Sequence, residues 1–283
     1  MPVKKNLRTL LTLLLLTVFL GSGIHALRLH AQYGLARDTY DLARETAVSP
    51  SGPVRVQLPD MVPPLTPEPS LPSGEEAPPL PEQDLQEAAP DDEPCPEELS
   101  RIDLAALRKQ NEDVRGWIAI PGTPLEYPIM QGADNQVYLN HTWLGRPSSV
   151  GSIFLECQNS GDFTDFNTII YGHRMRDGSM FASLKYYDSA DHFTDHPYVY
   201  IVDDAGVHRY EIFAAYEAGV TTSTYYLSFT EERRQEFIDS ALERSVIDTG
   251  IVPSVHDRIL TLSTCTGQGY DTRWVVQARL HAA

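Results

Sequence analysis

Residues 261–280 read TLSTCTGQGYDTRWVVQARL, a stretch in which two strand-like runs flank a short loop with two glycines. The first run ends at Cys265 and the second begins at Arg273. Thr, Val and Trp are enriched in strands, whereas Gly and Asp are typical of the connections between them. The stretch therefore predicts two strands, one closed by a thiol and the next opened by a guanidinium.

Eight such runs occur along the chain, at residues 117–120, 125–129, 152–156, 168–171, 198–202, 209–216, 259–264 and 274–280. Turn-rich segments separate them, a pattern typical of a mainly antiparallel barrel or sandwich. Helices are expected within residues 96–111, where leucines recur at helical spacing, and as insertions at residues 178–187 and 230–245. The sequence thus predicts a mainly β fold with an N-terminal helix and a helical insertion before the seventh strand.

The composition is strongly acidic. The 283 residues include 22 Lys and Arg against 39 Asp and Glu, for a formal net charge of −17, which argues against nucleic-acid binding. Residues 50–99 alone hold twelve acidic side chains, one basic side chain and fourteen prolines. Such a segment cannot bury enough apolar surface to offset the entropy of ordering. Residues 47–96 are therefore expected to form a flexible linker, and residues 97–283 the folded domain.

The N-terminus is typical of an exported protein. A basic tail, residues 1–8, precedes an uncharged apolar run at residues 9–27. As a helix this run would span roughly 28 Å, close to the hydrocarbon thickness of a bilayer. It predicts a single-pass anchor in the cell membrane, with the tail in the cytoplasm and the folded domain outside, followed by a helical segment at residues 28–46. A cleaved signal peptide is the alternative, because small residues follow the strongest apolar stretch.

The three cysteines, Cys95, Cys157 and Cys265, do not make a paired set for an exported protein. Cys157 lies inside the strand-like SIFLEC and is expected to be a small buried hydrophobic side chain. Cys265 differs because of its neighbours: His173 follows the fourth strand and Arg273 opens the eighth. If the fourth, seventh and eighth strands are adjacent, these three side chains converge on one face of the barrel.

A thiol, an imidazole and a guanidinium together suit acyl transfer. A thiolate attacks a peptide carbonyl and forms a thioester. An imidazole can protonate the departing amine and later accept a proton from the incoming nucleophile. A guanidinium keeps its charge and can hold the substrate or the developing oxyanion. The three residues therefore indicate a cysteine acyl transferase that requires no metal and no cofactor.

Several strings of the chain resemble those of sortases, and of class B sortases in particular. They are TLSTC with its following arginine, YGHRM around His173, and GWIAIPGTPLEYPIMQGADNQVYLNHTW at residues 116–143. The resemblance covers residues 97–283, and the helical insertion is a further class B feature. It implies an eight-stranded sortase-type β-barrel and a cysteine transpeptidase that cleaves a C-terminal sorting motif after its threonine. The product is then passed to an amine of a peptidoglycan precursor or of a pilin.

The resemblance also implies roles for individual residues. Cys265 corresponds to the nucleophile, His173 to the general acid and base, and Arg273 to the group that stabilises the oxyanion or the bound motif. Contacts with the sorting peptide are implied for a further set: Leu139, Ser263, Tyr225 and Tyr226. The implied partners are secreted proteins bearing a sorting signal, the amine acceptor and the membrane, and class B enzymes accept motifs like Asn-Pro-x-Thr.

Two other functions remain open from the sequence. A different cysteine acyl transferase, similar to the L,D-transpeptidases, would also act on cell-wall peptides. In those enzymes an arginine lies very close after the cysteine, whereas eight positions separate Cys265 from Arg273 here. A non-catalytic surface-binding module is the second alternative, and it would keep its function after Cys265→Ala.

Overall fold

The computed structural model describes residues 2–48, 95–266 and 271–281. Within these residues the strands are β1 Val114–Ala119, β2 Glu126–Met130, β3 Ile153–Leu155, β4 Asn167–Tyr171, β5 Tyr198–Asp203, β6 Gly206–Gly219, β7 Ile259–Cys265 and β8 Thr272–Leu280. The α-helices are α1 Pro2–Ala47, α2 Leu104–Arg108, α3 Ala190–Asp195 and α4 Glu231–Arg244. Three 3-10 helices join them: η2 Leu99–Arg101, η3 Phe181–Asp188 and η4 Ser223–Tyr225. Each predicted strand run overlaps one of the eight strands.

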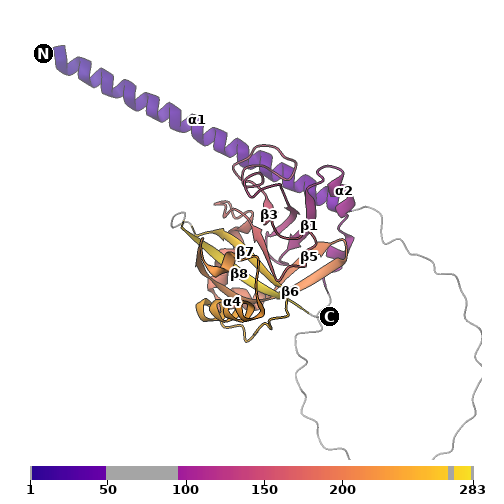
Figure 1. Cartoon of the computed structure of the whole chain (residues 1–283). Coiled ribbons are helices and arrows are strands. Elements are labelled where there is room, and N and C mark those ends of the chain that lie inside the picture. The colour runs from indigo at the N-terminus through magenta and orange to yellow at the C-terminus, as the bar shows by residue number, and fades with distance from the viewer. Residues whose placement is uncertain (1, 49–94, 267–270, 282–283) are drawn as a thin grey trace, which may run out of the picture.

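The strands close into a barrel in the order β1-β2-β3-β4-β7-β8-β6-β5, with β5 pairing back to β1 (Figure 1). The pairs β2 with β3 and β4 with β7 are parallel, and the other neighbouring pairs are antiparallel. Closure gives each strand a partner on both sides, so the barrel presents no open sheet edge. The predicted eight-stranded, mainly β fold is confirmed.

Three strand ends meet at one edge of this barrel. Because β4 and β7 are parallel, their carboxyl ends lie together, and Tyr171 pairs with Ser263 there. β8 runs antiparallel to β7, so its first residues lie beside the last residues of β7, and Cys265 pairs with Arg273. The fourth, seventh and eighth strands are thus adjacent, as the predicted convergence required.

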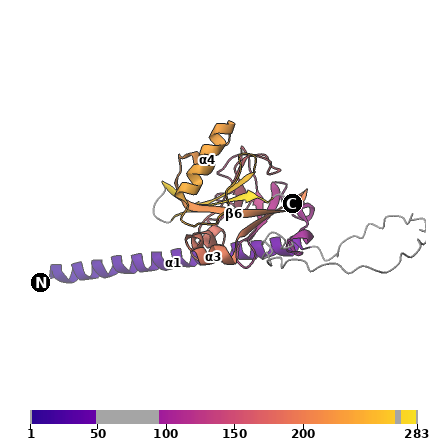
Figure 2. The same cartoon turned by 90° about the horizontal axis from the view of Figure 1, so that it is seen from below.

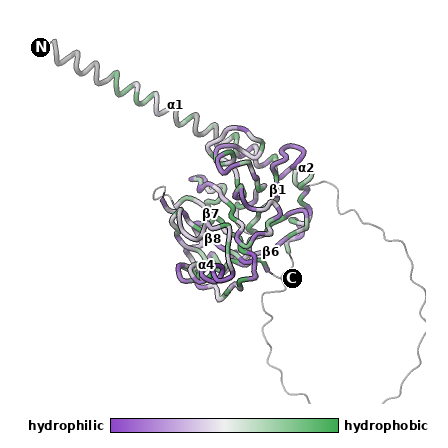
Figure 3. Tube along the Cα trace, viewed as in Figure 1, coloured by the Kyte–Doolittle hydropathy of each residue, from purple (hydrophilic) through white to green (hydrophobic). Residues whose placement is uncertain are grey.

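Two apolar clusters hold the elements together. The larger one includes buried side chains from all eight barrel strands, among them Trp117 and Leu262. The smaller one lies where α4 packs on β6, through Phe237, Ile238 and Phe213. The rest of α4 is hydrophilic and faces away from the barrel (Figure 3). Burial of each large side chain contributes about 1.5–3 kcal/mol, so this single amphipathic face holds the insertion in place.

The helix expected within residues 96–111 is not continuous. Ile102 is extended, with φ −67° and ψ 118°, and it separates η2 from α2. Asp103 then caps α2, because its carboxylate accepts a 2.9 Å hydrogen bond from the Ala106 backbone nitrogen. Aspartate favours a helix N-cap over a helix interior, which explains why the leucine spacing marks two short helices. The insertion predicted at residues 178–187 is likewise mainly the 3-10 helix η3, followed by α3.

α1 contains the predicted helical segment at residues 28–46 and ends at Ala47. Its C-terminal part lies along the barrel in both views (Figures 1 and 2). Tyr40 and Ala43 are buried in this contact, and the Trp143 indole donates a 2.7 Å hydrogen bond to the backbone oxygen of Thr39. The folded unit therefore includes the end of α1, which precedes the start expected at residue 97.

The prediction of a membrane anchor needs correction. In the described part of the chain, no helix combines the length and the apolar character needed to cross a membrane. This finding contradicts the predicted single-pass membrane anchor at residues 9–27. Of the predicted linker, residues 49–94 lie outside the described residues.

Candidate active site

The barrel edge where β4, β7 and β8 meet carries the three predicted catalytic side chains. Cys265 is the last residue of β7, Arg273 is the second residue of β8, and the two are register partners. His173 lies two residues beyond the end of β4, which runs parallel to β7. Strand pairing alone therefore brings together a thiol, an imidazole and a guanidinium from distant parts of the sequence.

An interaction of hydrogen-bond type between the His173 and Cys265 side chains shifts the pKa of both groups. It raises the pKa of the imidazole and lowers the pKa of the thiol, while burial opposes both shifts. On the other side of the ring, His173 Nε2 lies 2.8 Å from the backbone oxygen of Leu139. A carbonyl oxygen only accepts, so Nε2 carries a proton and Nδ1 is the ring nitrogen that remains for other partners. The backbone of Leu139 thus sets the orientation of the imidazole.

Two arginines lie near the thiol. Arg273 donates a 2.9 Å hydrogen bond to the backbone oxygen of Thr272, and Arg174 donates one to that of Thr266. After the hydrogen bond from His173, the charge of Arg273 is the next cause that lowers the pKa of Cys265, and Arg174 adds a smaller effect. Because the thiolate is the nucleophilic form, this arrangement increases the reactive fraction of Cys265.

A cleft of about 580 Å³ opens beside Cys265. Its volume falls in the range of pockets that bind small molecules and short peptides. Six of the seven residues predicted for the site line it: Cys265, His173, Arg273, Leu139, Ser263 and Tyr225. The structure therefore brings the predicted nucleophile, its partners and most of the predicted peptide contacts to one cavity.

One wall of the cleft is a set of hydrogen-bonded side chains. The hydroxyls of Tyr225 and Ser263 lie 3.0 Å apart, and the Tyr225 ring stacks on Tyr171 with an interplanar angle of 13°. Tyr171 donates a 3.0 Å hydrogen bond to Glu156 Oε2, and Asn135 donates a 2.6 Å bond to the same oxygen. Burial and then the Glu156 carboxylate raise the pKa of Tyr171, which keeps this hydroxyl protonated as a donor. The wall is therefore both aromatic and rigid.

Buried Asn167 holds the chain segment that carries Tyr225. Its amide nitrogen donates to the backbone oxygens of Thr224 and Tyr226, at 3.1 and 2.9 Å, and its amide oxygen accepts from Thr261 Oγ1 at 2.6 Å. A side chain of β4 thus fixes η4 over the cleft. The Tyr226 side chain is 46% exposed and does not line the cleft, so the structure does not bring it to the other predicted residues.

The sequence did not predict three residues of the cleft wall, namely Asn135, Glu156 and Tyr171. They lie in the strings DNQVYL, SIFLEC and YGHRM. Tyr171 is the last residue of β4 and lies two positions before His173, so its closeness in sequence to the predicted imidazole was an available signal. Glu156 follows a strand of buried residues, and an acid at such a position needs hydrogen-bonding partners.

Cys157 differs from its predicted role as a buried hydrophobic residue. It is half-buried, and its thiol donates a 3.3 Å hydrogen bond to Glu156 Oε1. Burial and then this carboxylate raise the pKa of Cys157, opposite to the direction at Cys265. β3 ends at Leu155, so Cys157 already belongs to the following turn. Of these two half-buried thiols, Cys265 is the one whose pKa is lowered, so its surroundings favour the thiolate.

Comparisons with known proteins agree on one family. A family model described as the sortase domain matches residues 118–281. Sortase B of Listeria monocytogenes serovar 1/2a (strain ATCC BAA-679 / EGD-e) is 40% identical over 185 residues, which cover 64% of this chain and 74% of that protein. Sortase B of Staphylococcus aureus (strain NCTC 8325 / PS 47) is 34% identical over 189 residues, covering 65% and 77%.

Solved structures give the same result. A Staphylococcus aureus sortase B–substrate complex matches with a TM-score of 0.60 and 32% identity, over 64% of this chain and 85% of that one. Clostridium perfringens sortase B matches with the same TM-score and identity, over 64% of this chain and 100% of the other. The barrel and the arrangement of its strands are therefore those of known, experimentally solved proteins.

Proposed function

Because this chain belongs to the sortase family, as a class B member, we propose that Cys265, His173 and Arg273 carry out its transpeptidation reaction. Sortases of this class are cysteine transpeptidases that act on proteins with a sorting signal and on amine acceptors. The observation that carries the assignment is the convergence of Cys265, His173 and Arg273 on one cleft, where Cys265 and Arg273 are register partners. Family membership also decides against an L,D-transpeptidase-like enzyme and a non-catalytic binding module.

In the first half-reaction the Cys265 thiolate attacks the carbonyl carbon of the threonine in the sorting motif. A bond forms between Sγ and this carbon, and the carbonyl electrons move onto its oxygen. Arg273 stabilises that oxyanion with its fixed positive charge. As the oxyanion collapses, the peptide C–N bond breaks and His173 donates a proton to the departing amine. A thioester on Cys265 and a free C-terminal fragment result.

In the second half-reaction an amine attacks the thioester carbonyl. His173, now neutral, accepts a proton from the attacking nitrogen, and the C–S bond breaks as the new amide forms. The sulfur leaves as thiolate, and the protonated His173 again stabilises it. The enzyme therefore returns to its starting state with no net gain or loss of protons.

The sorting peptide is proposed to lie in the cleft, in contact with Leu139, Ser263 and Tyr225. Two observations support this placement: the cleft leads directly to Cys265, and its wall of stacked tyrosines offers both apolar faces and hydroxyl groups. Staphylococcus aureus sortase B, a structurally similar protein, has been solved as a substrate complex. An Asn-Pro-x-Thr-like motif is the first choice of peptide for this cleft.

The acceptor is proposed to be the amine of a peptidoglycan precursor or of a pilin. Similarity supports an amine, because a related sortase B has also been solved in complex with triglycine, a peptide that ends in a free amine. The choice between the two acceptors is a matter for experiment. A glycine or diamino-acid amine represents the first acceptor, and a lysine side-chain amine in a folded pilin represents the second.

The test uses the full chain with quenched fluorescent sorting peptides, each with and without an amine acceptor. We expect cleavage after threonine, an amide product when the amine is present, and loss of both in Cys265→Ala. Cys157→Ala is the matched control, because it removes the other half-buried thiol and should leave turnover unchanged. Turnover that survives Cys265→Ala, or no turnover by a folded wild-type chain on any peptide of the panel, would overturn the proposal.

A further inference from the structure

We propose that Tyr40, on the helix that precedes residues 49–94, is a positioning residue for His173. Tyr40 lies outside the cleft and acts through the backbone of Gly151. The proposal rests on the role of His173 as general acid and base. It makes the C-terminal part of α1 a component of the active-site scaffold and not only a connection to the barrel.

The first route from α1 to the imidazole begins at the Tyr40 hydroxyl. This side chain is 4% exposed, and its hydroxyl donates a 2.6 Å hydrogen bond to the backbone oxygen of Gly151. It also lies 3.1 Å from Ser152 Oγ, which in turn donates a 2.8 Å bond to the backbone oxygen of His141. The Ser152 backbone nitrogen donates to the Tyr138 backbone oxygen, also at 2.8 Å. One hydroxyl from a distant helix thus ties together both ends of the loop that contains Leu139.

Gly151 is in direct contact with the groups that orient His173. Its φ is +61°, and a Cβ placed on it would lie 2.6 Å from the Leu139 backbone oxygen and 3.0 Å from His173 Cδ2. That same Leu139 oxygen accepts the hydrogen bond from His173 Nε2. A small movement of the Gly151 backbone would therefore displace both the ring and its acceptor, and Tyr40 is the side chain that holds this backbone.

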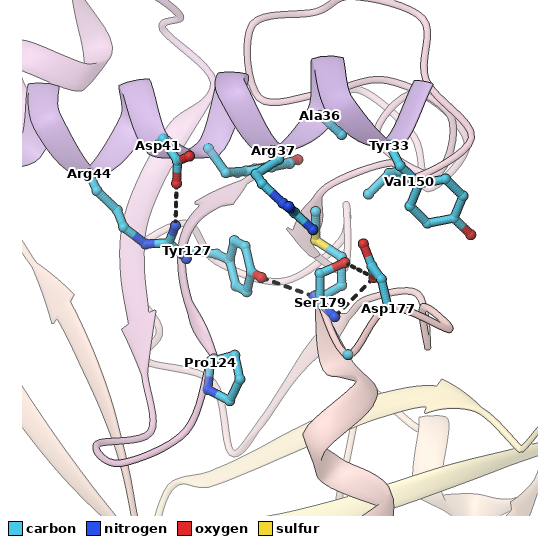
Figure 4. Close-up of a pocket in the computed structure, with 13 residues that line it drawn as sticks. Tyr33, Ala36, Arg37, Asp41, Arg44, Pro124, Tyr127, Val150, Asp177 and Ser179 are labelled. Carbon is cyan, nitrogen blue, oxygen red and sulfur yellow. Dashed lines mark hydrogen bonds and ion pairs between the residues drawn. The ribbon is translucent and has the colours of Figure 1, made fainter. Parts of the chain in front are cut away.

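A second route passes through Tyr127. The Tyr40 ring meets the Tyr127 ring edge-on, with centroids 5.3 Å apart, and the Arg44 guanidinium lies 5.5 Å above the same ring. The Tyr127 hydroxyl, which lies beneath the helix in Figure 4, accepts a 3.0 Å hydrogen bond from the Met180 backbone nitrogen. The next residue, Phe181, donates a 3.0 Å bond from its backbone nitrogen to the His173 backbone oxygen. α1 therefore reaches the backbone of His173 as well as its ring.

The contact between α1 and this part of the barrel depends on a few directed bonds. A cavity of about 300 Å³ separates the helix from the turn around Ser179, and Tyr33 and Arg37 line its helix side (Figure 4). Close packing is therefore interrupted here, and the hydroxyl bonds carry more of the positioning than they would in a filled interface. Loss of one hydroxyl should change geometry at His173 without unfolding the barrel.

The test compares Tyr40→Phe with wild type in the full chain. The substitution removes only the hydroxyl and keeps the ring against Tyr127. Loss of one hydrogen bond is expected to lower kcat about three- to tenfold while KM stays within about twofold. The pH midpoint for alkylation of Cys265 should also move upward, because a misplaced imidazole lowers the thiol pKa less. Tyr187→Phe is the matched control, since it removes a buried hydroxyl that donates 2.8 Å to the His196 backbone oxygen.

The Tyr187→Phe control distinguishes a failure of the positioning role of Tyr40 from a failure of the proposed function. If wild type and Tyr187→Phe show Cys265-dependent turnover and Tyr40→Phe matches them in kcat and in the alkylation midpoint, the positioning role is wrong. If neither wild type nor Tyr187→Phe shows Cys265-dependent turnover, the proposed function itself is wrong. Tyr127→Phe keeps the test decisive should Tyr40→Phe be unfolded, because it breaks the bond to Met180 and should also lower kcat. A lower melting temperature with unchanged kcat in the folded variants would assign a purely structural role.

Discussion

Cys265 and Arg273 face each other across the antiparallel β7 and β8 pair. This relationship is set by strand register, so the seven residues between them do not determine it. A slip of one residue would turn Arg273 to the opposite face of β8 and put Trp274 beside the thiol. The long pairing of β8 with β6 on its other side fixes the same register independently. The fold therefore presents a guanidinium to the nucleophile whatever the composition of the loop.

We predict that this guanidinium contributes more to the transition state than to substrate binding. Arg273→Gln should lower kcat about 10²-fold, the usual effect of removing one oxyanion donor, with a smaller change in KM. The kcat of Arg273→Lys should lie between those of wild type and Arg273→Gln, because lysine keeps the charge but not the planar set of donors. Steady-state kinetics on the preferred peptide measure this. Arg233→Gln, on the exposed face of α4, is the control, and an equal loss there would contradict the prediction.

The coupling of His173 and Cys265 predicts a pH dependence. The hydrogen bond from His173 and the charge of Arg273 lower the pKa of Cys265, so its thiolate should form below the value of about 8.5 that is usual for cysteine. Reactivity towards a neutral alkylating reagent is low below that pKa and rises as the pH increases through it. Because the pKa of His173 is raised, the active pair should lose its proton donor only at higher pH, and kcat/KM should be bell-shaped.

The variant His173→Ala separates the effect of His173 on the pKa of Cys265 from the effect of Arg273. It removes the largest effect that lowers the pKa of Cys265, while burial, which raises this pKa, remains. The alkylation midpoint should therefore move to higher pH, and Arg273→Gln should move it in the same direction. Peptide mapping by mass spectrometry distinguishes Cys265 from Cys95 and Cys157. A midpoint that does not change in His173→Ala would show that the imidazole does not stabilise the thiolate.

Gly151 provides a test of close packing around the imidazole. Gly151→Ala should lower kcat strongly, because its Cβ would meet both the Leu139 oxygen and His173. Gly145→Ala is a matched control: its φ is +71°, so the backbone strain is similar, but no atom lies within 4 Å of an added Cβ. The left-handed backbone should cost each variant about 1–2 kcal/mol of stability, and Gly151→Ala should lose more because its Cβ would also clash with backbone oxygens. Equal kcat in the two variants would mean that contact with His173 is unimportant.

The strands were predictable from the sequence because each satisfies a local rule. Runs such as residues 259–264 and 274–280 combine residues that favour strands with flanking turns, and the structure extends them by only one or two residues. The convergence of the proposed catalytic residues was predictable for a related reason. Cys265 and Arg273 lie at strand ends and His173 lies two residues beyond one, so the order of strands was enough to bring them together.

The features that escaped prediction depend on particular side-chain and backbone contacts, most of them with distant parts of the chain. Ile102 breaks a helix because Asp103 caps the next one and because Ile102 forms a β-bridge with Val48. Tyr225 lies in the cleft and Tyr226 outside it because Asn167 binds the backbone of this segment. Neither the leucine spacing within residues 96–111 nor the tyrosine pair at residues 225–226 indicates such contacts. A membrane anchor was predicted from apolar length alone, which the described residues do not support.

Substitution of Asn167 should distinguish an effect on substrate binding from an effect on the chemical step. Asn167→Ala would leave the backbone oxygens of Thr224 and Tyr226 and the hydroxyl of Thr261 without this partner. Unsatisfied buried polar groups cost about 1–3 kcal/mol each, so the free energy of unfolding should fall by at least about 2 kcal/mol. The loosened segment carries Tyr225, so KM should rise while kcat changes little.

Gln277→Ala is the matched control for this prediction. Gln277 is also fully buried and also binds Thr261, with a 2.9 Å hydrogen bond from its amide nitrogen, but its other partner is Tyr216 on β6. Its loss should destabilise the chain to a similar degree and leave KM unchanged, because the contacts of Asn167 with the Tyr225 segment remain. Chemical denaturation measures the first effect and peptide kinetics the second. If both variants raise KM equally, KM reports general loosening of the barrel, and Asn167 has no specific part in shaping the cleft.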